Sequence, residues 1–133
     1  MLNLDVRRLG GQIVMGESSI DIYDLAVQAG SKAINRIDKS TMNNIISVFQ
    51  GNPDADKAFK ELILYIARQT GRREIDRSVS RVMLSHLKNM YERYKGDELR
   101  ENVSRYLTLM KWVYESNVTG VSSFKEFINR LAK

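Results

Sequence analysis

The chain contains 133 residues, of which 43% are hydrophobic and 28% are charged, and this length and composition fit one globular domain. It has no cysteine and a single proline, which excludes disulfides, thiolate metal sites and proline-rich recognition segments. No continuous apolar stretch matches a signal peptide or a membrane span, so we expect a cytoplasmic protein that makes no membrane contact.

The net charge of +5 is distributed unevenly along the chain. Residues 1–56 hold five Lys/Arg and seven Asp/Glu, whereas residues 57–133 hold sixteen Lys/Arg and nine Asp/Glu. Residues 57–133 therefore carry the entire net positive charge of the chain. Such an asymmetry indicates a basic surface that meets an anion, most often nucleic acid, and a basic surface that merely keeps the protein in solution is the alternative.

Residues 1–18 are predicted to form an irregular N-terminal arm. Leu2, Leu4 and Val6 alternate with polar residues, which allows a short strand or an extended segment. The three glycines of this stretch argue against a helix. The rest of the chain, residues 19–133, is predicted to form one helical bundle domain.

Apolar residues recur at helical spacing after the arm and predict five or six helices. The expected breaks between them lie near Gly51, Gly71, Gly96 and Gly120. Nothing in the sequence alternates over enough residues to build a sheet. We therefore predict an all-α fold, a single bundle of five to six helices with short connections.

The first three helix starts are marked by residues that typically cap helices. Ser19 is expected to cap the first helix, and Asp38 or Ser40 the second. The pair Asn52-Pro53 predicts a third helix that has an asparagine cap and a proline at its first helical position.

Two long helices and a short one are predicted in the second part. The fourth helix is expected over residues 74–95, and the fifth over residues 97–117 with Asp97 as its cap. Ser123, followed three residues later by Glu126, matches the capping box of a last short helix. The buried side of this helix is expected to consist of Phe124, Phe127, Ile128 and Leu131.

No constellation of residues indicates catalysis. His86 is the only histidine, so metal sites and nucleophilic machinery built on histidine are unavailable or incomplete. Its place at the edge of an apolar stripe favours a packed or half-exposed side chain over a catalytic one. The pair Gly10-Gly11 lacks the spacing and the lysine of a phosphate-binding loop. Most carboxylates lie at helix starts, where they favour the helix dipole. We therefore predict a protein that is not an enzyme and holds no metal or cofactor.

Basic residues are densest between Arg68 and Arg81, where the sequence has five arginines. Arg68 and Arg72 are four residues apart, which puts them on one side of the third helix. The same spacing puts Arg73, Arg77 and Arg81 on one side of the fourth helix. A lysine seven residues after Arg81 continues the row. The candidate nucleic-acid-binding residues are Arg68, Arg72, Arg73, Arg77, Arg81 and Lys88, which we call the arginine ridge.

Such a row of like charges has two interpretations. Like charges four residues apart destabilise an isolated helix, so a group outside the helix should compensate them. Arginine binds phosphate through a bidentate fork, which favours contact with a nucleic-acid backbone. The alternative is local, because the arginines can also pair with Glu74 and Asp76 or cap the carbonyls before Gly71.

The fifth helix is apolar over a wide arc that includes Leu109 and Trp112. A helix with two apolar faces in a small protein often lies centrally or docks on another chain. Leu109 and Trp112 are therefore the candidate protein-interface residues. The competing interpretation is that Trp112, next to Lys111, stacks on single-stranded nucleic acid.

Three segments carry a resemblance to a known family. Their sequences are RIDKSTMNNI at residues 36–45, LYIARQTGR at residues 64–72 and YLTLMKWVY at residues 106–114. They are similar to the second-helix start, the end of the third helix and the late apolar-aromatic helix of the small helical subunit of type III-A (Csm) CRISPR-Cas effector complexes.

The resemblance implies a non-catalytic subunit present in several copies. It would stack along the guide RNA and contact the guide–target backbone through basic side chains, so its partners would be RNA, further effector subunits and its own copies. Two other classes are left open by the residues. One is the small subunit of an archaeal type I effector, or another helical protein that binds nucleic acid, and the other is a helical bundle that binds only proteins.

Overall fold

The computed structural model describes residues 20–133, so the predicted N-terminal arm lies outside the described residues. The cap expected at Ser19 is wrong, because Asp21 caps the first helix. This part of the chain contains six α-helices and no strand, which confirms the predicted all-α bundle. The helices are α1 (Ile22–Ala33), α2 (Lys39–Gln50), α3 (Ala55–Gly71), α4 (Arg77–Arg93), α5 (Gly96–Ser116) and α6 (Phe124–Leu131). None of them is long and apolar enough to cross a membrane.

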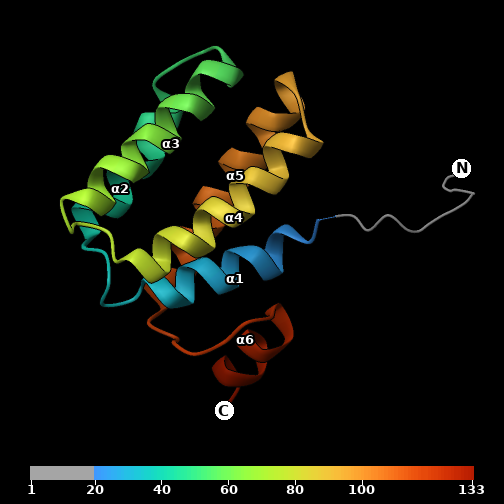
Figure 1. Ribbon diagram of the computed structural model, residues 1–133. Helices are drawn as coiled ribbons and strands as arrows, with labels where there is room; N and C mark the ends of the chain where they lie inside the picture. Colours follow the sequence, from blue (N-terminus) through green and yellow to red (C-terminus); the bar gives the residue numbers. More distant parts are fainter. Residues whose placement is uncertain (1–19) are drawn as a thin grey trace, which may run out of the picture.

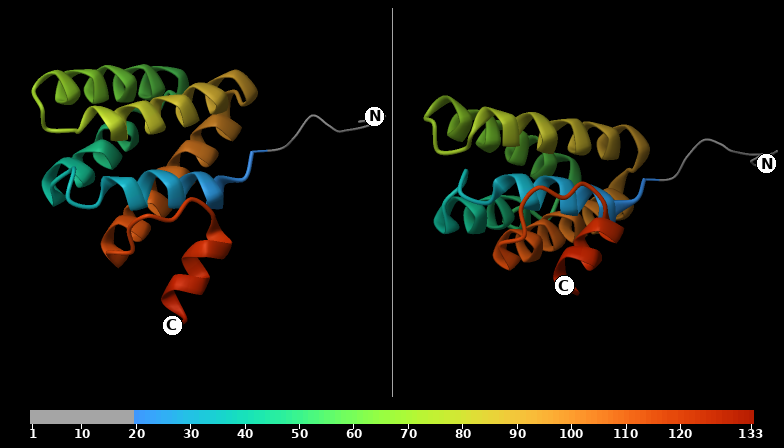
Figure 2. Two further views of the ribbon diagram at one scale, coloured as in Figure 1. Left: turned by 60° about the horizontal axis from the view of Figure 1, so that its bottom comes forward. Right: turned by 90° about the horizontal axis from the view of Figure 1, so that it is seen from below.

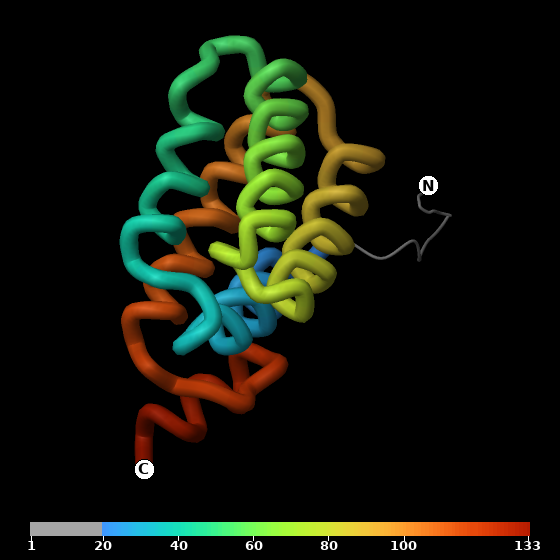
Figure 3. The backbone as a smooth tube through the Cα atoms, turned by 60° about the vertical axis from the view of Figure 1, so that its left-hand side comes forward, coloured from blue at the N-terminus to red at the C-terminus, as the bar shows by residue number. Residues whose placement is uncertain are grey.

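The helices α1 to α5 surround one core, and α6 stands apart from it (Figure 1). α1 packs most extensively on α5, and α2 packs on α3 as an antiparallel neighbour (Figure 3). The largest fully buried side chains come from α2 to α5, with Ile75 from the loop between α3 and α4, and include Phe49, Leu62, Met83 and Tyr106. The loops after α1 and α3 meet at an antiparallel bridge between Ile37 and Ile75, which brings two distant parts of the sequence together.

Aspartates cap most of the helices. Asp21, Asp38, Asp54 and Asp76 accept backbone N–H groups at the starts of α1 to α4, so the expected cap at Asp38 is confirmed. The cap expected at Asn52 is wrong. Asn52 Oδ1 instead accepts the backbone N–H of Asp54 at 2.9 Å and holds the loop before α3, where Asp54 is the cap.

The last two helix starts also differ in part from the sequence pattern. Lys95 is the N-cap of α5 and makes no capping bond, so the expected cap at Asp97 is wrong, and this carboxylate lies in the first turn near the helix dipole. Ser123 Oγ accepts the N–H of Glu126 at 3.2 Å and confirms the cap of α6. In a capping box the carboxylate of Glu126 would accept the N–H of Ser123, but here it accepts the N–H and the hydroxyl of Ser122.

The predicted buried side of α6 is wrong. Phe124, Ile128 and Leu131 are 43–56% exposed, and Phe127 alone is half-buried. Phe127 packs on a small cluster separate from the main core. The physical reason is the position of α6, which lies against α1 at the edge of the bundle and therefore has no second helix to cover its apolar stripe (Figure 2).

Candidate nucleic-acid interface

The end of α3 positions Arg72 and Arg73. The N–H of Arg73 bonds Thr70 O at 3.1 Å and the N–H of Glu74 bonds Gln69 O at 2.8 Å, the pair of bonds that defines a Schellman motif. Arg73 occupies the left-handed position of this motif, with φ of 67°. Gly71, the expected end of the helix, is its last helical residue and does not itself make the turn.

The start of α4 positions the rest of the arginine ridge. Asp76 caps the helix by accepting bonds from the N–H and the hydroxyl of Ser78. Because the turn after α3 uses residues 72–75, α4 begins at Arg77 rather than at residue 74 as predicted. From there Arg77, Arg81 and Lys88 share the side of α4 opposite its buried residues.

All six residues of the arginine ridge are exposed. Within residues 20–133, none of their side chains makes an ion pair or a hydrogen bond, in contrast to Lys60 on α3, which pairs with Asp56 at 2.8 Å. The local alternative of pairing with Glu74 or Asp76 therefore has no contact to support it there. Ser78 is the main cause of the lowered pKa of Asp76, and Arg36 contributes less.

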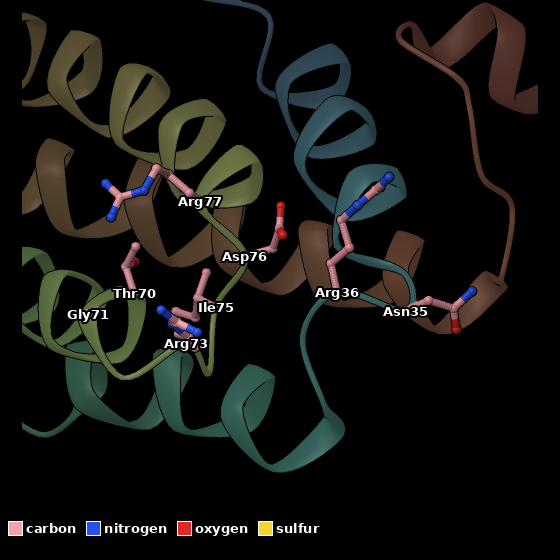
Figure 4. Close-up of a pocket in the computed structure, with 8 residues that line it drawn as sticks. All are labelled: Asn35, Arg36, Thr70, Gly71, Arg73, Ile75, Asp76 and Arg77. Carbon is pink, nitrogen blue, oxygen red and sulfur yellow. The ribbon is translucent and has the colours of Figure 1, made fainter.

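A cavity of about 640 Å³ lies between the α1–α2 loop and the α3–α4 loop, and we call it the loop cleft. Two ridge residues line it, Arg73 and Arg77, and Arg36 joins them from the other loop (Figure 4). The remaining four ridge residues do not line it. Its full lining consists of Asn35, Arg36, Thr70, Gly71, Arg73, Ile75, Asp76 and Arg77.

Arg36 is the residue that sequence reasoning missed. It belongs to the part of the chain with a negative balance, and no spacing links it to the ridge. The structure joins the two loops through the Ile37–Ile75 bridge and through the N–H of Asp76, which bonds Arg36 O at 3.4 Å. Its guanidinium bonds Lys32 O at 3.0 Å. The first of the three resemblance segments begins at Arg36 but implies no role for it.

His86 is a buried structural residue rather than an exposed acid or base. Its Nδ1 lies 2.9 Å from the hydroxyl of Tyr106 and its Nε2 lies 3.0 Å from Gln28 Oε1. Burial lowers the pKa of His86 to about 4. Among residues 20–133 there is no group of three or more His, Cys, Asp or Glu placed to hold a metal ion.

The two candidate interface residues on α5 have different surroundings. Leu109 is half-buried and packs against the core, whereas Trp112 is 62% exposed. Both line a shallow groove of about 590 Å³ whose walls are all α5 residues. The other helices of residues 20–133 therefore leave most of the Trp112 side chain uncovered.

Comparison of this chain with protein-family models, with curated proteins and with solved structures finds no match.

Proposed function

We propose that this chain is a non-catalytic small subunit of a CRISPR-Cas ribonucleoprotein effector, in which several copies stack along the guide RNA and contact the guide–target backbone through the arginine ridge. The observation that carries the proposal is the ridge itself. Six exposed cations lie at and after one helix junction, and no acid within residues 20–133 neutralises them.

The chemistry of the ridge suits a phosphate backbone. Guanidinium groups offer five donors in a planar fork that matches two phosphate oxygens, and the exposed positions along α4 follow a line rather than presenting a short recognition helix. Contacts of this kind position a protein on nucleic acid without reading its sequence. The affinity should therefore fall steeply with salt and depend little on the RNA sequence.

The double variant Arg72→Glu/Arg77→Glu tests the ridge. We expect its affinity for unrelated RNA sequences to fall by at least about tenfold, and its salt slope to fall by roughly one for each phosphate that the protein no longer neutralises. The fold should survive, because both residues lie on the surface. Fluorescence anisotropy over a salt series measures both quantities.

The matched control is Lys57→Glu/Lys125→Glu, which changes the net charge equally at two exposed positions outside the ridge. This control should bind RNA nearly as wild type does. If the ridge variant is folded and binds RNA as well as wild type at low and moderate salt, the ridge is only a solvated surface and the proposal fails.

Assembly is expected to depend on Trp112. Exposed tryptophans at the centre of an interface are frequent hot spots, so Trp112→Ala should weaken self-association or docking to an effector subunit by about tenfold or more while leaving the unfolding temperature nearly unchanged. Sedimentation and co-purification measure the assembly. Leu64→Ala on α3 is the control, because Leu64 is 69% exposed but lies outside the α5 groove. A wild-type chain that is monomeric at all concentrations and captures no partner contradicts this part of the proposal.

The second candidate function is a bundle that binds only proteins. The exposed apolar stripe of α6, together with Trp112, favours it, because apolar surface of this extent often marks a docking site. RNA binding separates the two candidates, since a chain with no salt-dependent affinity for RNA can still associate through these surfaces.

A further inference from the structure

The exposed apolar stripe of α6 continues onto α1. Phe124, Ile128 and Leu131 follow one another at helical spacing and are 43–56% exposed, and Tyr23 of α1 is 49% exposed. The rings of Tyr23 and Phe124 meet edge to face, with their centroids 6.0 Å apart. We call these four residues the α6 patch. The helices of residues 20–133 leave this patch uncovered, because α6 lies against α1 at the edge of the bundle.

The α6 patch lies beside the start of the described chain. Figure 2 shows α6, in red, beginning next to the blue end of α1 and then running away from the bundle. The N–H of Phe124 bonds Asp24 Oδ1 at 2.8 Å, which holds the first residue of α6 to the first turn of α1. Ile20, the first described residue, precedes Tyr23 by three positions. The 19 residues before Ile20 therefore join the fold next to the patch.

The sequence before Ile20 contains an uncharged apolar segment of suitable length. Residues 9–15 read LGGQIVM, with Ile13, Val14 and Met15 in succession. Residues 16–19 connect this segment to Ile20 and can span about 13 Å when extended. The segment itself can reach about 23 Å, whereas the eight residues of α6 measure about 12 Å along the helix axis. It is therefore long enough to return to Tyr23 and to follow the whole patch.

The size of the α6 patch favours a segment of the same chain over a second copy. A large apolar side chain carries about 200 Å² when fully exposed, so four half-exposed ones offer roughly 400 Å². Each partner of a stable complex buries about 800 Å². The patch is too small to hold a second copy by itself. A segment tethered beside it needs less area, because it binds at an effective concentration in the millimolar range.

We infer that residues 9–15 dock on the α6 patch of their own chain, with Ile13 and Val14 as the main apolar contacts. Removal of apolar surface from water on both sides provides the driving force. The contact ties α6 to the start of α1 and closes the patch to other partners, while Trp112 on α5 stays exposed for assembly. It requires no nucleic acid and is therefore independent of the proposed function.

A spin label on Gln12→Cys tests the contact, because the chain has no cysteine of its own. The nitroxide should broaden the NMR amide signals of residues 124–131. The labelled, isotope-enriched chain is diluted into a large excess of unlabelled wild type, so that broadening within one chain persists and broadening between copies disappears. Loss of the broadening on dilution would assign the patch to a second copy and overturn the inference.

Serine variants of the arm separate docking from mere attachment. In Ile13→Ser/Val14→Ser the broadening over α6 should fall several-fold, and the unfolding temperature should fall by about 3 °C. The matched control is Leu2→Ser/Leu4→Ser, which removes two apolar side chains from the same arm outside residues 9–15. It should change neither quantity. Unchanged broadening in Ile13→Ser/Val14→Ser, or an equal loss in the control, overturns the inference.

The variant Ile128→Ser/Leu131→Ser alters the other side of the contact. It should reduce the broadening as much as the arm variant does. When both pairs are combined, the unfolding temperature should fall no further than in the more severe of the two, because each pair removes the same contact. Leu64→Ser, at a 69% exposed position on α3, is the control and should leave the broadening unchanged. Additive effects of the two pairs would show that they do not meet and would overturn the inference.

Discussion

Replacement of Gly30 by alanine is expected to lower the free energy of unfolding by about 3 kcal/mol, because the added methyl group overpacks the contact between α1 and α5. A Cβ at this position would lie 2.5 Å from the backbone oxygen of Met110 and 2.7 Å from Val113 Cβ. The oxygen of Met110 belongs to the backbone, so it cannot rotate away from the added methyl group. Since α1 packs most extensively on α5, the shift would spread through the main core.

Gly71→Ala is the matched control for this experiment. A Cβ on Gly71 meets no atom within 4 Å, and this residue lies in the last turn of α3 with no positive φ. Alanine should therefore stabilise the protein by up to about 1 kcal/mol through its higher helix propensity. Urea denaturation of both variants measures the difference. A Gly30→Ala protein as stable as wild type contradicts the close packing of α1 on α5.

Acidification is expected to produce a comparable loss of stability through His86. The amide of Gln28 donates to Ser122 O at 3.1 Å, which turns Gln28 Oε1 toward His86 Nε2. Since Oε1 only accepts, Nε2 carries the proton and Nδ1 accepts the hydroxyl proton of Tyr106. Burial also raises the pKa of Tyr106, so this hydroxyl stays protonated. The folded chain thus holds a neutral imidazole.

The direction of this pH effect on stability follows from the protonation of His86 in the folded and the unfolded chain. The pKa of His86 is about 4 in the folded chain and 6.5 at its ordinary value, so between these values the unfolded chain binds more protons. The stabilisation is therefore complete above pH 6.5 and is lost as the pH falls from 6.5 to about 4. The total loss is about 3 kcal/mol, from 1.36 kcal/mol for each pKa unit.

His86→Gln tests this prediction, because it replaces the titrating imidazole with an amide that does not titrate. The variant should be less stable than wild type at pH 7, and its stability should vary much less between pH 6.5 and 4.5. The carboxylates with lowered pKa values, such as Asp38 and Asp76, titrate below this window and should affect both proteins equally. Equal pH dependence of the two proteins contradicts the prediction.

The sequence by itself determined the helices, because each is specified by local information. Apolar spacing of three and four residues predicted all six helices, and a side chain placed to bond the next free N–H predicted the caps at Asp38 and Ser123. The row of ridge arginines was also visible, since i,i+4 spacing on a helix sets which residues share a side. The failures at Ser19, Asn52 and Asp97 are each shifts of two residues. A neighbouring aspartate takes the cap of α1 and of α3, and α5 begins after Lys95, which makes no capping bond.

Only the tertiary structure decided which surfaces are covered and which distant residues meet. The stripe of α6 has the same periodicity as a buried helix, yet it is exposed because no second helix lies over it. Arg36 lines the same cleft as Arg73 and Arg77 because two loops pair at Ile37 and Ile75, which are 38 positions apart in the chain. The local sequence pattern determines which residues share one side of a helix. Whether that side is buried, and which distant residues lie together, depends on long-range contacts between segments.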